Sequence, residues 1–250
     1  MLSSRTLAKV SAETDIAQVS DFKFNDDGLY TGEIHAGTLV PHGTGRMNYH
    51  PQSSGDSGDL ESYEGQWYWG SWHGSNGVLQ FRNGDTYMGS FEHNTRQGQG
   101  LYMWTDGRTY EGEFYQNQRH GRGTFTFADG AVYEGDFVMG KRHGHGKYSF
   151  PNGSSYEGEW KDGQYDGYGV FTWNDGRMYA GEWKGSQHHG RGRKTDCYGQ
   201  VEYDGLWVNH KPEGDLRKPP LSTGLPQEVI VNANYTSQDE CSDLDASIAV

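Results

Sequence analysis

The chain has 250 residues, of which 38 are Gly, while 14% are aromatic and only 32% are hydrophobic. So few apolar residues and so much Gly exclude a thick aliphatic core and favour a thin structure in which aromatic rings pack on backbone. The formal net charge of −13 provides no overall positive field for nucleic acid or for an anionic membrane surface. No segment approaches the roughly 20 apolar residues that a membrane-spanning helix needs.

Residues 1–21 precede the patterned part of the chain. They contain Ala, Leu and Glu, and they lack the long apolar run of a secretory signal. We expect an N-terminal extension over 1–21 that is either a short helix or disordered. Directly after it, Phe22–Gly28 has the spacing of a closing strand and indicates half of a repeat.

A Tyr-x-Gly motif then recurs at a nearly constant spacing. From Tyr63 onward the spacings are 24, 23, 23, 23, 23 and 24 residues, which chance does not produce. The motif tyrosines are Tyr30, Tyr63, Tyr87, Tyr110, Tyr133, Tyr156, Tyr179 and Tyr203. A period of this length indicates a repeat protein, in which each repeat is one supersecondary unit stabilised by its neighbours.

Each repeat has the same internal pattern. Tyr156–Trp160 alternates strictly, with Tyr, Gly and Trp on one face and two carboxylates on the other, as in a half-buried strand. A turn at Asp162-Gly163 follows, and residues that tolerate a left-handed backbone hold its place elsewhere: Asn94, Asn117 and Gly140. A second alternating strand, Gly167–Trp173, and a hairpin turn, Asn174–Gly176, complete the unit.

The glycines explain the composition. A Gly stands eleven residues after each repeat tyrosine from Tyr63 onward: Gly74, Gly98, Gly121, Gly144, Gly167, Gly190 and Gly214. A strand that carries rings needs neighbours without side chains, so that the rings can lie on the backbone. We therefore predict an all-β fold, an elongated single-layer array of about eight tandem antiparallel β-hairpins over 22–216. Residues 217–250, rich in Pro, Ser, Asn and Asp, predict a disordered acidic tail.

The segment Tyr110–Gly130 closely resembles the MORN repeat (membrane occupation and recognition nexus), and so do Tyr133–Gly153 and Tyr156–Gly176. The resemblance covers about residues 22–216. It implies a scaffold more than an enzyme, because MORN repeats occur in cytoskeletal and ciliary scaffolds, in membrane-junction proteins and fused to kinase or methyltransferase domains. Between its ends this chain has no room for such a fused catalytic domain.

Two sets of side chains are candidate binding sites. The aromatic–Gly face of the array is the candidate protein-binding surface, and its residues are Tyr110, Phe114, Tyr133, Phe137, Tyr156, Trp160, Trp173, Tyr179 and Trp183. Basic residues near the turns form a candidate edge for lipid or an acidic partner: Arg119, Arg122, Lys141, Arg142, Lys147, Arg191 and Arg193. Cross-strand pairing with Glu is the alternative explanation for the basic residues.

No pattern indicates catalysis, a cofactor or a metal site. Paired carboxylates such as Glu157 and Glu159 recur in most repeats, which is typical of a solvated strand face. Histidines precede the repeat Gly at His42, His73, His120, His143 and His189. Neighbouring repeats lie about 10 Å apart, too far for two such histidines to share a zinc ion with bonds of about 2 Å. We expect them to stabilise turns, with zinc held between molecules as the alternative.

We therefore hypothesise a non-catalytic repeat scaffold for protein partners, cytoplasmic and associated with the cytoskeleton or with a cilium or flagellum. The alternatives are a peripheral phosphoinositide-binding adaptor that uses the basic edge, and a recruiting subunit of a larger enzyme complex. A homodimer is a further expectation, because an open sheet end presents unpaired backbone groups. Nucleic acid is not expected as a partner.

Overall fold

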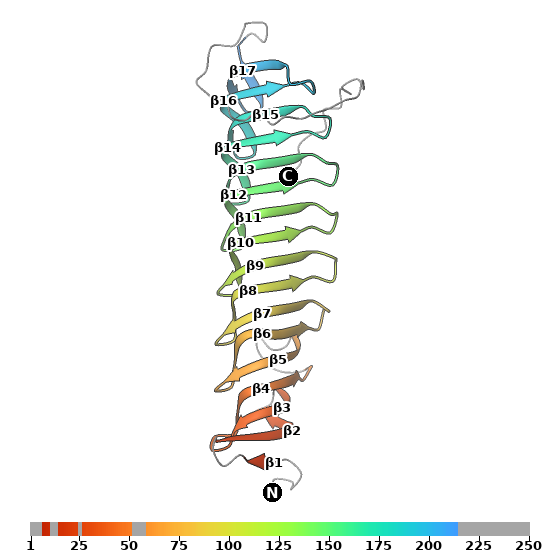
Figure 1. Cartoon of the computed structure of the whole chain (residues 1–250), viewed down its shortest axis with the longest axis vertical. Helices are drawn as coiled ribbons and strands as arrows, with labels where there is room; N and C mark the ends of the chain where they lie inside the picture. Colours follow the sequence, from red (N-terminus) through yellow and green to blue (C-terminus); the bar gives the residue numbers. More distant parts are fainter. Residues whose placement is uncertain (1–6, 11–14, 25–26, 52–58, 215–250) are drawn as a thin grey trace. The chain divides into compact units, whose positions relative to one another are not determined.

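The computed structural model describes residues 7–10, 15–24, 27–51 and 59–214 (Figure 1). The expected tail over 217–250 lies outside these residues. The chain divides into two compact units, which are described separately. Unit 1 holds the described residues up to Asp129 together with Asp136–Gly140, and unit 2 holds Gly130–Gly135 and the described residues from Lys141 onward.

Unit 1 is an antiparallel sheet whose strands follow chain order, each pairing with the next. Its strands are β1 (Leu7–Val10), β2 (Ile16–Phe24), β3 (Gly28–His35), β4 (Val40–Tyr49), β5 (Leu60–Tyr68), β6 (Ser71–Phe81), β7 (Thr86–Glu92), β8 (Thr95–Met103), β9 (Thr109–Tyr115) and β10 (Gln118–Thr126). Strand β11 (Val132–Val138) contributes residues to both units.

Unit 2 has the same construction. Its remaining strands are β12 (Lys141–Ser149), β13 (Ser155–Lys161), β14 (Gln164–Thr172), β15 (Met178–Lys184), β16 (Gln187–Thr195), β17 (Val201–Val208) and β18 (Lys211–Glu213). No α-helix occurs in the described part of the chain. The predicted all-β array of tandem antiparallel hairpins, one for each repeat tyrosine, is confirmed.

The expectation for the N-terminal extension is wrong where the structure describes it. Strands β1 and β2 stand where a short helix or disorder was expected over 1–21, so the sheet begins at Leu7 and not at residue 22. Ala17 and Val19 are buried and pair with β3, while Gln18 between them is exposed. This alternation makes β2 a full strand, since every second side chain enters the core.

Two-residue turns join the two strands of most repeats. Asp162 and Gly163 have φ values of 51° and 89°, and Gln116 and Asn117 have values of 47° and 65°. Positive φ at both central residues is typical of a type I′ turn, whose twist matches that of a β-hairpin. The left-handed turn positions expected from the sequence are confirmed.

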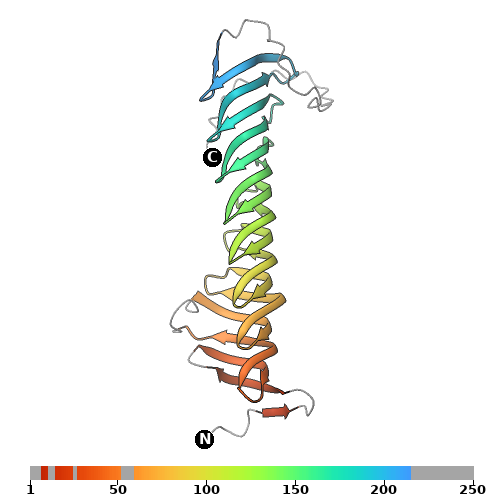
Figure 2. The same ribbon diagram turned by 90° about the vertical axis from the view of Figure 1, so that its left-hand side faces the viewer.

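A β-bulge interrupts most of the repeat hairpins, namely β3–β4, β5–β6, β7–β8, β9–β10, β13–β14 and β15–β16. Between β13 and β14 the register runs Gly158↔Gly169 and then moves to Trp160↔Tyr165, so the second strand holds extra residues. An extra residue in one strand bends it and leaves backbone groups outside the ladder. Figure 2 shows the bent hairpins in both units.

The repeat tyrosine and a carboxylate satisfy the backbone groups of the bulge. The Tyr156 hydroxyl donates to the carbonyl oxygen of Glu159 at 2.9 Å, and the Glu159 carboxylate accepts from the backbone N–H of Tyr168 at 2.8 Å. The bond from hydroxyl to carbonyl recurs at Tyr30, Tyr63, Tyr87, Tyr110, Tyr179 and Tyr203. A bulge can therefore be buried without unpaired polar groups.

Glycine is required beneath each ring. A Cβ added at Gly123 would lie 2.5 Å from the Tyr110 hydroxyl oxygen, and one added at Gly112 would lie 2.5 Å from the Gly123 Cα. No side chain fits at such distances without displacing the ring or the strand. The prediction that glycines make room for rings is confirmed for these glycines, which stand two and thirteen residues after the tyrosine. It is wrong for those eleven residues after it: at Gly121 and Gly167 an added Cβ would meet Glu113 and Glu159, and the backbone φ is positive, at 56° and 108°.

We predict that Gly123→Ala destabilises the protein by about 1–3 kcal/mol, because the added methyl group overpacks the core against the Tyr110 ring. The matched control is Gly37→Ala in an exposed turn, where the added Cβ meets only the His35 ring, at 3.2 Å. Urea unfolding followed by circular dichroism measures both variants. An equal, small change in both midpoints would contradict the packing explanation.

Candidate functional site

The predicted aromatic–Gly binding face is the core of the protein and not an open surface. Eight of its nine residues are at most 5% exposed: Tyr110, Phe114, Tyr133, Phe137, Tyr156, Trp160, Tyr179 and Trp183. Only Trp173 is half-buried. These side chains are therefore not available to a partner, because the bent hairpins close over the face that carries the repeat tyrosines.

One repeat position covers the flat face of the repeat tyrosine. Trp72 stacks on Tyr63, Tyr165 stacks on Tyr156 at 3.7 Å between ring centroids, and His188 stacks on Tyr179 at 3.7 Å. In other repeats the position holds a guanidinium group: Arg96, Arg119 and Arg142. Each of these side chains presents a plane to the ring, so this position can hold either an arginine or a residue with an aromatic ring.

Two members of the predicted basic edge, Arg119 and Arg142, occupy this stacking position. The Arg119 guanidinium lies 4.8 Å from the Phe125 ring centroid and donates to the Gly140 carbonyl at 2.8 Å. That of Arg142 lies 4.4 Å from the Trp160 ring centroid and donates to a turn carbonyl at 2.9 Å. Burial lowers the pKa of Arg142 below its usual value. Both residues stabilise the sheet and are removed from any exposed basic edge.

Most of the remaining basic residues pair with carboxylates. Arg122 contacts Asp136 at 3.4 Å in unit 1, and in unit 2 the pairs are Lys141–Asp162 at 3.3 Å, Lys147–Glu157 at 4.0 Å and Arg193–Asp204 at 2.7 Å. Arg191 is exposed, and its backbone N–H donates to the carboxylate of Glu182. Cross-strand pairing therefore accounts for this set better than a free basic edge does.

The histidines before the repeat Gly act mainly through their backbone. The repeat tyrosine hydroxyls approach the carbonyl oxygens of His73, His120 and His189 at 3.4 Å, so the main chain closes the bulge there. Among the described residues no group of three or more His, Cys, Asp or Glu side chains could hold a metal ion. No helix in the described part of the chain is long and apolar enough to cross a membrane.

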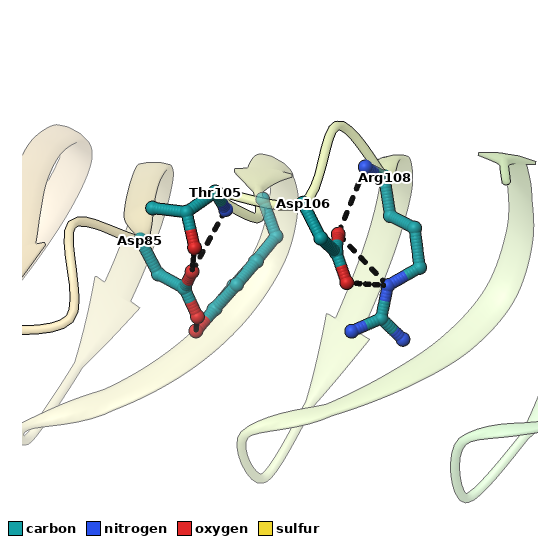
Figure 3. A network of polar contacts seen from close by, with 5 residues as sticks. Asp85, Thr105, Asp106 and Arg108 are labelled. Carbon is teal, nitrogen blue, oxygen red and sulfur yellow. Dashed lines mark hydrogen bonds and ion pairs between the residues drawn. The ribbon is translucent and has the colours of Figure 1, made fainter. Parts of the chain in front are cut away.

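The hairpin turns between repeats carry a polar network in unit 1 (Figure 3). The Asp85 carboxylate accepts from the backbone N–H of Thr105 at 3.0 Å and from the Tyr102 hydroxyl at 3.1 Å. Burial raises the pKa of Asp85, but these hydrogen bonds outweigh it and hold the pKa below its ordinary value. Asp106 binds the Arg108 guanidinium at 2.8 Å. Both carboxylates are engaged in holding the turns, and neither is positioned as an acid or a base.

An exposed group of rings lies at the turns between the paired strands of the first repeats in unit 1. We call it the tip cluster, and its members are His35, His42, Tyr68, Trp69, His73 and His93. Trp69 lies 4.6 Å from the His35 ring and 5.1 Å from the His42 ring, and Tyr68 lies 5.5 Å from both His42 and His73. Tyr68 and Trp69 are 47% and 49% exposed. The cluster is an aromatic surface that presents Tyr68 and Trp69 to solvent.

Trp69 occupies an unusual backbone conformation for its size. Its φ is 48°, in a two-residue turn whose first position holds His93, Gln116, Met139, Asp162, Gly185 or Asn209 in other repeats. A bulky side chain at positive φ costs free energy, which a polar turn residue would avoid. Met139 is a second apolar residue at the same turn position, with a φ of 49° and 48% exposure. Apolar residues at turns that favour Asn or Gly are the signal in the sequence that points to this cluster.

A family model described as MORN repeat matches seven segments, which together make up more than half of the chain: residues 63–86, 87–107, 110–132, 133–155, 156–176, 179–197 and 203–214. The β3–β4 hairpin lies outside these segments, although its Tyr30 is buried and makes the same hydroxyl-to-carbonyl bond. Comparison with curated proteins finds no match.

Three solved structures are similar to the chain at low identity. The TCP domain of Drosophila melanogaster SAS-4 (dCPAP), in complex with a proline-rich motif of Ana2 (dSTIL), is 12% identical, covers 52% of this chain and 72% of that chain, and has a TM-score of 0.36. A mutant and the wild type of the TCP10 domain of Danio rerio CPAP are 16% and 17% identical, with TM-scores of 0.32 and 0.29. Both cover 80% of this chain, and 93% and 94% of their own. TM-scores this low carry no conclusion on function.

We predict that Arg119→Ala lowers the free energy of unfolding by about 1–2 kcal/mol, because it removes both a stacked guanidinium and a hydrogen bond to a turn carbonyl. Arg122→Ala is the matched control, since that side chain is 81% exposed and its ion pair contributes less than about 1 kcal/mol. Urea unfolding compares the two. A larger loss for Arg122→Ala would show that the exposed ion pair, and not the stack, stabilises this repeat.

We predict that acid destabilises unit 2 through His188. Burial, followed by the nearby His210 and Lys194, lowers the pKa of His188 to about 3. The unfolded chain therefore binds a proton that the folded chain rejects, and stability falls as the pH drops below about 6.5, by on the order of 1 kcal/mol per pH unit. His188→Tyr, which copies Tyr165 of the preceding repeat, removes this loss, and Tyr165→His adds a similar one. Urea unfolding midpoints are measured from pH 7 to pH 4. The same dependence of the midpoint on pH in the wild type, His188→Tyr and Tyr165→His would contradict the prediction.

Proposed function

The chain belongs to the MORN-repeat family, and from that premise we propose that it is a non-catalytic scaffold that binds protein partners through the tip cluster. The observation that carries the proposal is the exposure of Tyr68 and Trp69 within a continuous group of rings. Exposed aromatic residues that cluster on one surface are typical of protein-binding sites, where Trp and Tyr contribute most of the binding energy.

The fixed geometry of the cluster supports this role. Its rings contact one another and are held on paired strands or in a two-residue turn, so little side-chain freedom is lost when a partner binds. The strained turn at Trp69 keeps that ring at the surface. A residue that costs folding free energy and remains exposed is better explained by binding than by stability.

We further propose that the scaffold is cytoplasmic and acts at a cytoskeletal or ciliary structure. The family contains scaffolds of this kind, and an array of hairpins offers several turns to partners at regular spacing. The chain recruits other proteins in this proposal and performs no chemistry itself. The same role is compatible with the chain being the non-catalytic, recruiting subunit of a larger enzyme complex.

The alternative of a phosphoinositide-binding adaptor has less support. Of its seven candidate residues, Arg119 and Arg142 are stacked in the sheet, and four others are paired with carboxylates. A headgroup would have to displace these carboxylates from the basic side chains. In flotation assays with vesicles that contain phosphoinositide, Lys141→Glu together with Arg191→Glu should then leave the small amount of bound protein unchanged.

We predict that Tyr68→Ala with Trp69→Ala abolishes the capture of partners while leaving the fold intact. Proximity labelling in the native cell compares the wild type, this double variant and Tyr168→Ala. Tyr168 is a suitable control because it is also exposed, at 38%, but lies outside the tip cluster. The wild type and Tyr168→Ala should label the same proteins, including cytoskeletal or ciliary components.

Circular dichroism of the purified variants checks that each one is folded. The same labelled proteins and the same localisation in all three cell lines would reject the tip cluster as the binding site. Labelling that consists of membrane proteins, together with strong and salt-sensitive vesicle binding, would reject the scaffold in favour of the lipid-binding adaptor.

A further inference from the structure

The last hairpin of unit 2 is incomplete. The second strands of the preceding repeats, such as β14 and β16, have nine residues, but β18 has only three. It pairs with Leu206, Trp207 and Val208, whereas β16 pairs with β17 as far as Val201. The outer side of β17 is therefore covered along part of its length only, as far as the described residues show.

A single departure from the repeat explains where β18 stops. Thirteen residues after Tyr156 and Tyr179 stand Gly169 and Gly192, where an added Cβ would lie 2.3 Å from the tyrosine hydroxyl oxygen. Thirteen residues after Tyr203 the sequence has Leu216. In the backbone position of those glycines a leucine side chain would overlap the Tyr203 ring, which disfavours continuing the hairpin as in the other repeats.

Tyr203 consequently lacks a neighbour that the other repeat tyrosines have. Tyr156 is packed edge-on by Trp183 of the following repeat, at 5.3 Å, and Tyr179 by Trp207, at 5.2 Å. The seven other repeat tyrosines are fully buried, but Tyr203 is only half-buried. In the described part of the chain its one ring contact is Trp207 of its own repeat.

Apolar side chains around this edge are exposed. Val201 is 45% exposed, Leu206 49% and Tyr198 66%, and all three belong to β17 or to the turn before it. A sheet edge with exposed apolar residues is a site for pairing with another strand, and proteins usually cover such edges. The edge of β17 is therefore suited to pairing with an added strand that carries apolar side chains.

We propose that the segment Glu228–Thr236 of the same chain adds to β17 as an edge strand and packs its apolar face on Tyr203. Val229, Val231, Ala233 and Tyr235 share one face of an extended segment, and the opposite face is polar except for Ile230, so the segment has one apolar face at strand spacing. It differs from the rest of the tail, whose composition predicts disorder. Tyr235 supplies the ring that a following repeat would otherwise provide.

The length of the connection permits this arrangement. Thirteen residues, 215–227, lie between the end of the described chain and the segment, and they span roughly 43 Å when extended. That is enough to return to either end of β17, because a strand of eight residues is roughly 27 Å long. The segment so placed acts as the cap of the array and blocks association of copies through this edge.

Hydrogen exchange measured by mass spectrometry tests the cap on the full-length chain. The test variant carries Val229→Asp and Val231→Asp, and the matched control carries two new carboxylates in the same tail outside the segment, Ser222→Asp and Thr223→Asp. We expect the amides of Val201–Val208 to exchange at least about tenfold faster in the test variant than in the wild type and the control. The other strands of unit 2 should be unchanged.

Add-back tests whether the segment itself is sufficient. A chain that ends at Gly214 keeps every described strand, and it should show the fast exchange of the test variant. A synthetic peptide of residues 226–238 should restore protection of β17, and the same peptide with Val229→Asp and Val231→Asp should not. Restoration by both peptides alike would overturn the proposal.

Two other results would also reject it. Equal exchange of β17 in the full-length chain and in the chain that ends at Gly214 would show that the tail leaves the edge uncovered. Protection that rises with protein concentration, together with a dimer mass of the full-length wild type in light scattering, would identify a second copy as the occupant. Because no residue of the tip cluster is changed, failure of the cap leaves the proposed scaffold function standing.

Discussion

The fold depends on the hydroxyl group of one tyrosine in each repeat. A hairpin bends where a bulge interrupts its ladder, and the bulge leaves backbone groups that would cost about 1–3 kcal/mol each if buried unpaired. The hydroxyl of Tyr156 and the carboxylate of Glu159 pair with these groups. The same tyrosine ring fills the space above the glycines, so one residue fixes both the bend and the core. The alternation predicted that both glutamates of this strand face solvent. Glu157 is indeed exposed, but the carboxylate of Glu159 accepts a hydrogen bond at the bulge.

The stacking position explains how a chain with few aliphatic residues has a core at all. Each repeat tyrosine needs a flat group against its ring, and the chain uses Trp72, Tyr165, His188 or an arginine for this purpose. An arginine contributes its plane to the ring and its N–H groups to the neighbouring turn carbonyl, so the ring and the carbonyl both stabilise its guanidinium group. A net charge of −13 is therefore compatible with basic residues that are needed for packing.

The period and the alternation of residues were sufficient to predict the strands and the turns, but not that several glycines eleven residues after the tyrosine meet a Glu or Gln side chain of the bulge, as Gly121 meets Glu113. They did not identify β2, because Ile16–Ser20 alternates over only five residues next to helix-favouring Ala and Glu. Alternation also shows which side chains share a face, but not that a bulge folds the sheet over that face. The aromatic–Gly face was therefore taken for a binding surface, although it is buried. The tip cluster could not be derived from spacing, since His35 and His42 come from the β3–β4 hairpin and Trp69 from the next one, and they meet only through sheet pairing.

The repeat itself restricts where a partner can bind. Inside the array each side chain on the tyrosine face is covered by its own repeat or by the next one, and substitution there affects stability first. Among the described residues, the most exposed large apolar side chains, at 45% or more, lie in or beside the turns within the repeat hairpins, on β17 or in the turn before it. Trp69 and Met139 in turns, and Val201 and Leu206 on β17, are apolar residues of this kind. In the proposed scaffold, specificity for a partner therefore resides in the residues that depart from the repeat, and the regular residues supply the rigid frame that positions them.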